Sequence, residues 1–480
     1  MNAKAVLHVL AWLVGGVGLL MGLCGAVSWG YGERAAARAL WLAGGGAAAL
    51  GAAAGALTRG GGMLSPRDGI GVVAFGWLAA GLAGAVPFLL AGTIGDFPSA
   101  FFESMSGFTT SGATVLACVE VCPKGLLLWR ALMQAIGGGG VLLLVMVFLP
   151  FTGAGGMQLF RAETTGPLKD RTEPRMASSA KMIWMCYGIL AGVLLVLLRF
   201  GGMTWFESVC HALTTVATGG FSTRTASIAG FGSVYIEIVI GVFMLLSGLN
   251  FACYVRALHG DFRPLWRSEQ NRAYLGLFAL AVAGCAGALW GLAGTGAGQA
   301  LRDGFFTCAS VMTSTGFCTA DFARWPAVGQ GILLVLMCVG GCAGSTAGGL
   351  KVVRGWVSLR ALARAVRGFF QPRVVLPLRM DGKPLGDELV VGVLAFVALF
   401  FLLALLGTLA MLLFVPDGKT AFSTVVSALG NTGPALGKVG IGNYAAVPAG
   451  GKFLLAFLML AGRLELYTVL AVFMPAFWRR

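Results

Sequence analysis

The sequence predicts an all-α polytopic membrane protein, with an N-terminal two-helix hairpin followed by four parallel helix–pore helix–helix repeats around a pseudo-fourfold ion pore. Hydrophobic residues make up 58% of the 480 residues and charged residues 11%, whereas about a quarter of a soluble globular chain is charged. Apolar stretches of about 20 residues, long enough to cross hydrocarbon, recur throughout. Between them, a short helix-like stretch and a Ser/Thr-rich turn with glycine occur four times.

The chain opens with an apolar hairpin, expected at Ala5–Trp29 and Ala36–Leu57 within a domain of residues 1–60. Lys4 precedes the first stretch, as in a signal sequence. The apolar run is too long for a signal h-region and is not followed by a convincing cleavage site. We therefore expect a retained first helix.

Four units follow, at residues 61–160, 161–260, 261–370 and 371–480, and each has an outward span, a re-entrant segment and a returning span. The re-entrant segments are too short to cross a membrane. Because each unit starts and ends on the same side, the repeats are parallel, unlike the inverted repeats of many secondary transporters. The outward spans are expected at Gly69–Leu90, Met182–Leu198, Ala273–Ala293 and Leu389–Val415. The re-entrant segments are expected at Ser99–Gly112, Thr204–Gly220, Ala300–Gly316 and Thr420–Gly433. The returning spans are expected at Gly125–Phe151, Ser233–Leu258, Gly329–Val353 and Gly451–Phe477.

A phenylalanine is expected to open each short helix. The spacing from Phe206 to Gly220 is longer than the spacings from Phe102 to Gly112, from Phe306 to Gly316 and from Phe422 to Gly433. It therefore predicts one extra helical turn in the second unit.

The four turns read TTSGAT, ATGGFST, TSTGFCT and NTGPA, and they align on one glycine each. Backbone carbonyls and hydroxyl oxygens replace the hydration shell of a cation without a fixed charge that would trap it. Half-helices that end at the turns would also direct negative dipole ends toward the ion. The turns contain no carboxylate, which argues against a divalent-cation ring. The candidate ion-binding residues are Thr109, Thr110, Ser111, Gly112, Ala217, Thr218, Gly219, Gly220, Thr313, Ser314, Thr315, Gly316, Gly430, Asn431, Thr432 and Gly433.

The returning span of the third unit contains GGCAGSTAGG, residues 340–349. Five glycines in ten residues disfavour a helix in lipid, and non-helical backbone is tolerated there only inside protein or beside water. This segment is a candidate gate, and a glycine-mediated packing face is the alternative. The gate residues would be Gly340, Gly341, Cys342, Ala343, Gly344, Ser345, Thr346, Ala347, Gly348 and Gly349.

Arg463 lies within the last apolar span and is also assigned to the gate. An arginine at the bilayer centre costs about 2.5–3.5 kcal/mol on insertion scales, so it should face the pore, as a barrier to cations, or a partner. Residues two apart do not face each other on a helix, which favours a third partner over Glu465.

Several other residues have more than one interpretation. Glu103 and Glu207 would either attract cations at an outer vestibule or satisfy helix ends. Trp129 and Arg130 are expected to anchor a span at the membrane interface. Cys118 and Cys122 lie close enough in sequence to pair in an outer loop.

The net charge of +15 does not indicate a nucleic-acid partner, because most of the basic residues fall in segments expected on one side. This bias places both termini in the cytoplasm. Two basic linkers, Arg161–Lys181 and Lys351–Glu388, are expected there and could touch anionic lipid. The dispersed His and acidic residues argue against a metal centre or a membrane enzyme.

The motifs FFESMSGFTTSGAT, TGGFSTR, TSTGFCTADF, GGCAGSTAGGLKVVR and NTGP with GRLELYTVL resemble the membrane subunits of the bacterial Trk/Ktr potassium uptake systems. That superfamily also holds the plant HKT transporters. The resemblance covers nearly the whole chain, and the N-terminal hairpin favours the TrkH-like branch.

The resemblance implies K⁺ uptake across the bacterial inner membrane, with Na⁺ and Rb⁺ as further ions and no cofactor on this chain. The aligned glycines would form the filter, residues 340–349 the intramembrane gating loop, and Arg463 the pore arginine. The family assembles as homodimers on a cytoplasmic ring of TrkA-like nucleotide-binding regulatory subunits. No turn carries the TVGYG string of K⁺ channels, so strict selectivity does not follow. A Na⁺- or H⁺-coupled K⁺ symporter is the alternative.

Overall fold

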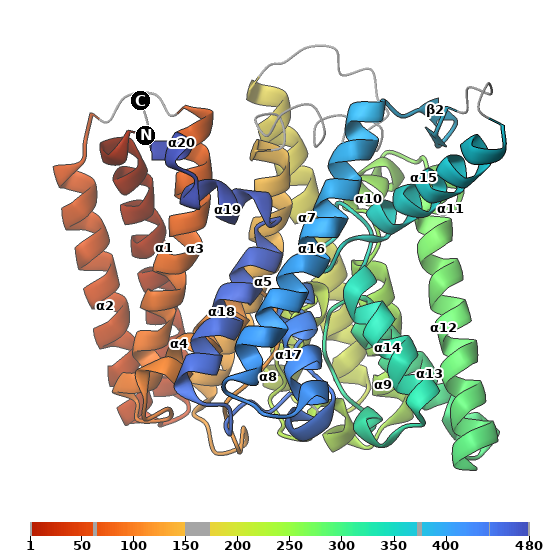
Figure 1. Cartoon of the computed structure of the whole chain (residues 1–480). Coiled ribbons are helices and arrows are strands. Elements are labelled where there is room, and N and C mark those ends of the chain that lie inside the picture. The colour runs from red at the N-terminus through yellow and green to blue at the C-terminus, as the bar shows by residue number, and fades with distance from the viewer. Residues whose placement is uncertain (1, 61–64, 149–172, 372–376, 441, 479–480) are drawn as a thin grey trace.

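The computed structural model describes the chain except for residues 1, 61–64, 149–172, 372–376, 441 and 479–480. Its long helices run side by side, and both termini lie at one end of the bundle (Figure 1). One two-stranded hairpin, β1 (Arg379–Met380) with β2 (Lys383–Pro384), lies at that same end.

The predicted N-terminal hairpin is formed by α1 (Ala3–Gly30) and α2 (Arg34–Leu57). Their backbones touch: a Cβ added to Gly44 would lie 2.5 Å from the carbonyl oxygen of Gly18, and one added to Gly18 would lie 2.5 Å from that of Gly44. Small residues let helices approach this closely in lipid. The close packing of α1 against α2 therefore requires glycine at positions 18 and 44.

Each of the four units supplies an outward helix, a short pore helix and a returning segment. Unit one has α3 (Pro66–Leu90), α4 (Phe97–Phe108) and α5 (Lys124–Phe148). Unit two has α7 (Glu173–Phe200), α8 (Trp205–Val216), α9 (Val234–Ser247) and α10 (Phe251–Leu258). Unit three follows α11 (Arg263–Arg267) and has α12 (Glu269–Ala293), α13 (Ala297–Met312), α14 (Ala327–Val339) and α15 (Val352–Phe370). Unit four has α16 (Asp387–Leu412), α17 (Gly418–Gly430), α18 (Ala449–Arg463) and α19 (Tyr467–Phe473), and α20 (Pro475–Trp478) ends the described chain.

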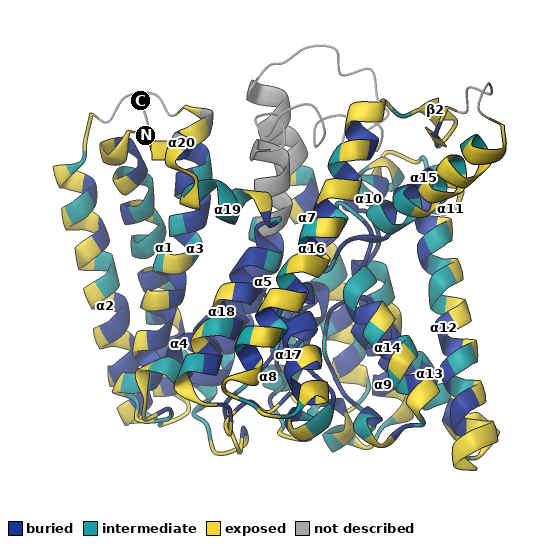
Figure 2. Cartoon of the chain, in the orientation of Figure 1, coloured by how far each residue is buried: buried dark blue, intermediate teal, exposed yellow. Residues whose placement is uncertain are grey.

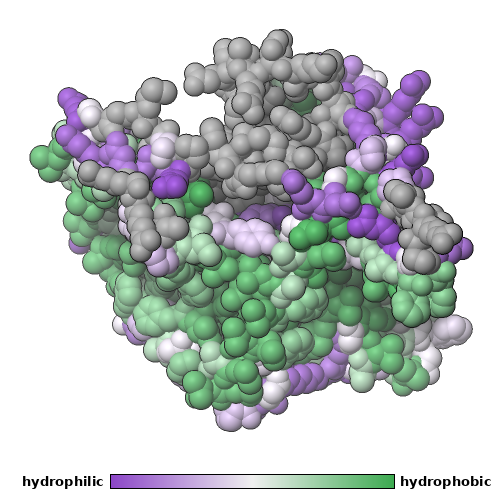
Figure 3. All heavy atoms as spheres, turned by 45° about the horizontal axis from the view of Figure 1, so that its top comes forward, coloured by the Kyte–Doolittle hydropathy of each residue, from purple (hydrophilic) through white to green (hydrophobic). Residues whose placement is uncertain are grey.

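Six of the described helices are long and apolar enough to cross a membrane, and two bent pairs raise the number to eight. Exposed residues line the outer faces of α2 and α16 (Figure 2). On the face shown in Figure 3, a hydrophobic belt lies between hydrophilic residues at the two ends. The chain is therefore a multi-pass helical membrane protein, as predicted.

All four pore helices begin before the phenylalanines that were expected to open them, and three of them begin at polar caps. The side chains of Asp96, Thr204 and Asp417 accept hydrogen bonds from backbone N–H groups in the first turns of α4, α8 and α17. The extra turn predicted for unit two is wrong, because α8 has 12 residues, as α4 does, and the longest pore helix is α13 with 16.

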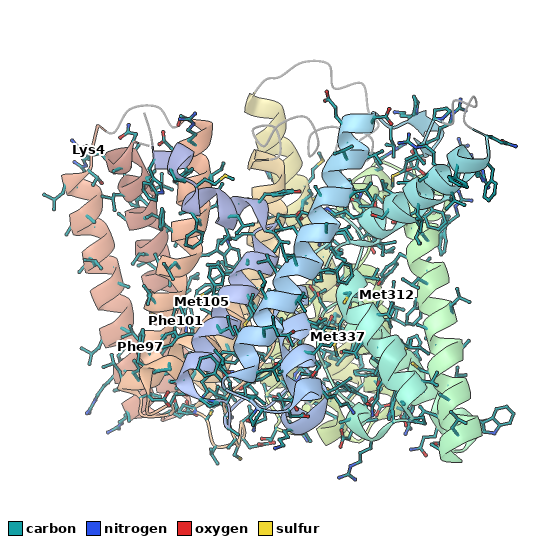
Figure 4. The ribbon with its side chains drawn as sticks, viewed as in Figure 1. Lys4, Phe97, Phe101, Met105, Met312 and Met337 are labelled. Carbon is teal, nitrogen blue, oxygen red and sulfur yellow. The ribbon has the colours of Figure 1, made fainter. Side chains whose placement is uncertain are left out.

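The apolar face of α4 packs against α18. Figure 4 shows Phe97, Phe101 and Met105 along this helix. The ring centroids of Phe97 and Phe101 lie 6.3 and 6.0 Å from that of Phe453. The Met105 side chain fills the space beside Gly81 of α3. The two contacts with Phe453 join the first unit to the last, and the contact of Met105 with Gly81 holds α4 against α3 within the first unit.

The returning segments of units two, three and four are all broken, and only the break in unit three was predicted. The pair α9–α10 bends by 93° and the pair α18–α19 by 116°. In the first break, the side chain of Asn250 accepts a 2.9 Å hydrogen bond from the Ala252 N–H and so starts α10. The sequence analysis missed both breaks because each span is long and apolar overall, although Asn250 lies in the first break and Glu465 in the second.

The hairpin contact gives a direct test. We expect Gly44→Val to lower the stability of the detergent-solubilised protein, by about 1–3 kcal/mol, because the new Cβ meets the Gly18 carbonyl. Thermal unfolding followed by tryptophan fluorescence would measure the change. Gly45→Val is the matched control, since a Cβ at Gly45 meets nothing within 4 Å. Equal unfolding temperatures for the two variants would contradict the prediction.

Candidate functional site

The four turns share one backbone conformation. Each has a non-glycine residue with positive φ two positions before its aligned glycine: Thr110 (56°), Thr218 (52°), Ser314 (53°) and Asn431 (52°). The glycines Gly112, Gly220, Gly316 and Gly433 have φ of 83°, 78°, 86° and 91°. Left-handed geometry is costly for ordinary residues, so its repetition at matching positions marks one structural element used four times.

The four turns also meet in a closed ring. A Cβ added to Gly112 would overlap the carbonyl oxygen of Gly219 in unit two. The same holds for Gly220 with the carbonyl of Thr315, and for Gly316 with that of Thr432. Gly433 closes the cycle against the carbonyl of Ser111 in unit one. Each unit therefore touches the next in chain order, and a side chain at any of the four glycines would force the ring apart.

The segments that follow the turns keep the same order around the ring. The Val119 N–H donates to the Thr225 hydroxyl (2.8 Å), the Ala229 N–H to the Cys318 carbonyl (3.2 Å), and the Tyr444 N–H to the Thr114 carbonyl (2.7 Å). Thr225 also donates to Glu120. Burial raises the pKa of Glu120, but the hydrogen bonds from Thr225 outweigh this and lower the pKa to about 2, so the carboxylate stays charged at neutral pH.

Some oxygens of the turns are engaged and others are not. The hydroxyls of Thr109, Thr218 and Thr313 each donate to a carbonyl of their own unit at 2.7 Å. By contrast, a second set is buried and has no hydrogen-bond partner within the part of the chain that the structure describes. This set comprises the Thr110, Ser111 and Thr432 hydroxyls and the Asn431 Oδ1. Buried polar atoms are normally paired, so these oxygens are available to a ligand.

Two side chains that the sequence analysis missed form hydrogen bonds with backbone groups of the turns. The Gln134 amide of α5 donates to the Gly219 carbonyl (2.6 Å) and accepts from the Phe221 N–H (3.0 Å). The Tyr444 hydroxyl donates to the Gly433 carbonyl (2.7 Å). Gln134 is a polar residue in an apolar span, which by itself indicates a functional position.

A buried ion pair braces units one and two. Arg130 donates to Glu103 at 2.8 Å, and both side chains are at most 2% exposed. Glu103 accepts from the Val115 N–H at 2.8 Å, and Arg130 donates to the Ser222 carbonyl at 3.1 Å. Glu103 therefore satisfies the backbone after the turn rather than forming a vestibule. Trp129 is also fully buried, so the expectation that Trp129 and Arg130 anchor the interface is wrong. Their polar groups find partners inside the protein.

In unit two, Glu207 plays a similar part. It caps its own helix through Thr204 and pairs with Arg224 at 2.9 Å. Of its two interpretations, the structure supports a role at the helix end.

The predicted break after Val339 is confirmed, and residues 340–351 form a loop that crosses beside the turns. The Cys342 N–H donates to the Gly248 carbonyl and the Phe251 N–H to the Gly344 carbonyl, both at 2.9 Å. The Gly348 N–H donates to the Ser314 hydroxyl at 2.5 Å. A Cβ on Gly348 would overlap the carbonyl of Gly430. This loop, residues 340–351, therefore contacts units two, three and four at once.

Arg463 fastens this loop. Its guanidinium donates to the Thr346 carbonyl at 2.8 Å and to the Gly137 carbonyl of α5 at 3.2 Å. It is the last residue of α18 rather than a mid-span residue. Glu465 pairs with Arg354 instead, which confirms that Arg463 has other partners.

Two peripheral expectations have different outcomes. Cys118 and Cys122 are free thiols, so they form no disulfide. The basic linker Arg161–Lys181 lies largely outside the described residues, whereas part of the second linker forms α15.

Comparison with known proteins identifies the family of this chain and agrees with its fold. The TrkH family, described as "Cation transport protein", matches residues 46–284 and 293–480. The Trk system potassium uptake protein TrkH of Salmonella typhimurium is 37% identical over 425 residues, which are 87% of each chain. TrkG of Escherichia coli, also a Trk system potassium uptake protein, is 32% identical. The crystal structure of the potassium transporter TrkH from Vibrio parahaemolyticus matches with a TM-score of 0.92 and 31% identity over 100% of both chains.

The buried ion pair gives a test of the brace. Arg130→Met should destabilise the protein by about 3–5 kcal/mol, because Glu103 is left buried without its partner. The double variant Glu103→Gln, Arg130→Met should recover part of the loss. Thermal unfolding of the purified protein would measure both.

Arg224→Met is the control for this test. The Arg224–Glu207 pair is more exposed, with Arg224 at 37%, so its loss should cost no more than about 1 kcal/mol. If Arg130→Met and Arg224→Met lowered the stability equally, the proposed stabilising role of the Glu103–Arg130 pair would be wrong.

Proposed function

Because the chain belongs to the TrkH family of cation transport proteins, we propose that it takes up K⁺ through the ring of four turns. The closed contact of each aligned glycine with the next unit's carbonyl is the observation that carries the proposal. This contact brings together backbone carbonyls of all four units and unpartnered side-chain oxygens of units one and four, inside a membrane protein. Such oxygens replace the water around a monovalent cation. The protein is a transporter, not an enzyme, and K⁺ is its cargo rather than a resident cofactor.

The route for the ion follows from the repeats. The pore helices end at the turns, so their negative dipole ends favour a cation there. A neutral ring binds a dehydrated ion without holding it as a carboxylate would. Na⁺ and Rb⁺ would compete for the same oxygens, with a preference set by the width of the ring.

Control of flux is proposed to lie in the loop of residues 340–351 and Arg463. The loop contacts three units beside the turns, and Arg463 holds its Thr346 carbonyl. Opening would require that carbonyl and the Gly137 carbonyl to be released together. A positive charge close to the route would also oppose cations.

The assembly is proposed on the same premise. We place the protein in the bacterial inner membrane with both termini in the cytoplasm, because the termini share one end of the bundle with the arginines of α15 (Figure 1). A homodimer on a TrkA-like regulatory ring fits that basic end. Coupling to Na⁺ or H⁺ would call for an ionisable acid along the route, but the buried Glu103 is paired with Arg130. Uptake that continues with the Na⁺ and pH gradients collapsed would exclude coupling.

Substitution in the ring tests the filter. Gly316→Ser places a Cβ against the Thr432 carbonyl of unit four, so the ring must widen. We expect the preference for K⁺ over Na⁺ to fall at least about tenfold, or about 1.4 kcal/mol. Radioactive Rb⁺ uptake into proteoliposomes, with K⁺, Na⁺ and Li⁺ as competitors, would measure it.

The matched control is Gly331→Ser in α14, where a Cβ meets nothing within 4 Å. It should leave the competition pattern of the native chain. If Gly316→Ser kept native discrimination, the assignment of the filter to these turns would fail.

Removal of the arginine tests the gate. Arg463→Ala should raise Rb⁺ flux, since it removes both a positive charge and the bond to the loop. A change of about 1 kcal/mol in the barrier corresponds to about a fivefold change in rate. Thr346→Val is the comparison: it removes hydroxyl bonds to Val216 and Ser247 but keeps the carbonyl that Arg463 binds, so it should raise flux less. Unchanged or lower flux in Arg463→Ala would contradict the proposed gate.

A further inference from the structure

A basic cavity of about 360 Å³ lies between α15 and β1. It is at the end of the bundle that carries both termini (Figure 1), and none of its lining residues belongs to the four turns. Four of its seven lining residues are arginines. The lining consists of Arg360, Arg364, Arg367 and Arg379 with Ala363, Pro377 and Leu378.

The positive charge of this cavity is only half balanced. Arg360 pairs with Glu269 at 2.9 Å and Arg364 pairs with Asp387 at 2.8 Å. Arg367 and Arg379 make no ion pair with any described residue. Guanidinium groups bind phosphate oxygens through paired, parallel N–H donors. The two unbalanced arginines therefore favour an anion of one or two charges in the cavity.

The same helix carries an exposed apolar stripe next to the arginines. Its members recur every three or four residues, which places them on one face of a helix. Phe369 is 84% exposed and Phe370 75%. The full stripe is Leu359, Leu362, Val366, Phe369 and Phe370. On the opposite side of the arginine row, Val353, Val357 and Ala361 are buried in a hydrophobic cluster with residues of α16.

This combination identifies the kind of ligand. A helix with a basic face beside exposed Phe and Leu is typical of helices that lie at a membrane surface. α15 lies across the end of the bundle rather than along it (Figure 1). We propose that the cavity binds the phosphate of an anionic phospholipid, with Arg367 and Arg379 as its principal ligands and the acyl chains along the apolar stripe. A soluble phosphate would use the arginines but not the stripe.

Binding of short-chain lipid to the full-length protein in a zwitterionic detergent tests the site. The probes are dioctanoyl phosphatidylglycerol, dioctanoyl phosphatidylcholine, glycerophosphoglycerol and inorganic phosphate, each followed by the shift in unfolding temperature. We expect phosphatidylglycerol to bind best. The double variant Arg367→Gln, Arg379→Gln should weaken the binding of phosphatidylglycerol about 25-fold, because each basic residue near anionic lipid contributes about fivefold to the affinity.

The control is the double variant Arg263→Gln, Arg267→Gln. It removes the same charge from α11, which lies outside the cavity, so the affinity for phosphatidylglycerol should stay as in the native protein. Phe369→Ser with Phe370→Ser should weaken phosphatidylglycerol but not glycerophosphoglycerol. The proposal is overturned if the cavity variant and the α11 variant bind phosphatidylglycerol equally, or if phosphatidylcholine binds as tightly. It is also overturned if glycerophosphoglycerol or inorganic phosphate matches the lipid, since the ligand would then be a soluble anion. A native lipid affinity together with loss of binding to a protein partner would assign the surface to that partner instead.

Discussion

The fold depends on one steric constraint, the contact between a glycine of each unit and a carbonyl of the next. A polar turn has no water to bind inside a bilayer, so its backbone groups must be satisfied by protein or by a ligand. Four such turns satisfy the constraint together, because each one shields the next. The pore helices, the polar caps of three of them and the Glu103–Arg130 pair hold the turns at this distance.

Much of this architecture could be predicted from the residues, because helices that cross lipid require long apolar runs that are easy to recognise in a sequence. Long apolar runs locate the spans, and repetition of a Gly-containing turn at the same place in four units locates the ring. The loop at residues 340–349 could be found for the same reason, since its five glycines disfavour a helix. The family resemblance drew on those same motifs.

Other features depend on contacts between distant segments, which no local pattern contains. The breaks before Phe251 and Tyr467 lie in spans that are long and apolar overall, and the polar residues there, Asn250 and Glu465, do not by themselves specify a bend. Gln134 meets the turn of unit two only because α5 packs beside α8, and Tyr444 reaches the Gly433 carbonyl from a later loop. Arg130 resembled an interface residue because its partner, Glu103, lies a full segment away. The starts of α4, α8 and α17 were misplaced because their polar caps, not their aromatic residues, determine where these helices begin.

The backbone of the ring is regular across the four units, but the side chains and segments that contact it differ from turn to turn. Gln134 hydrogen-bonds to the second turn, Tyr444 hydrogen-bonds to the fourth, and the loop of residues 340–351 hydrogen-bonds to the third. All four quadrants are encoded in one polypeptide. A mutation in a channel built from four identical subunits appears in every quadrant at once, whereas here it alters a single one. A substitution in one turn therefore changes one quadrant and leaves the other three as they were, so the proposed permeation pathway could be altered one quadrant at a time.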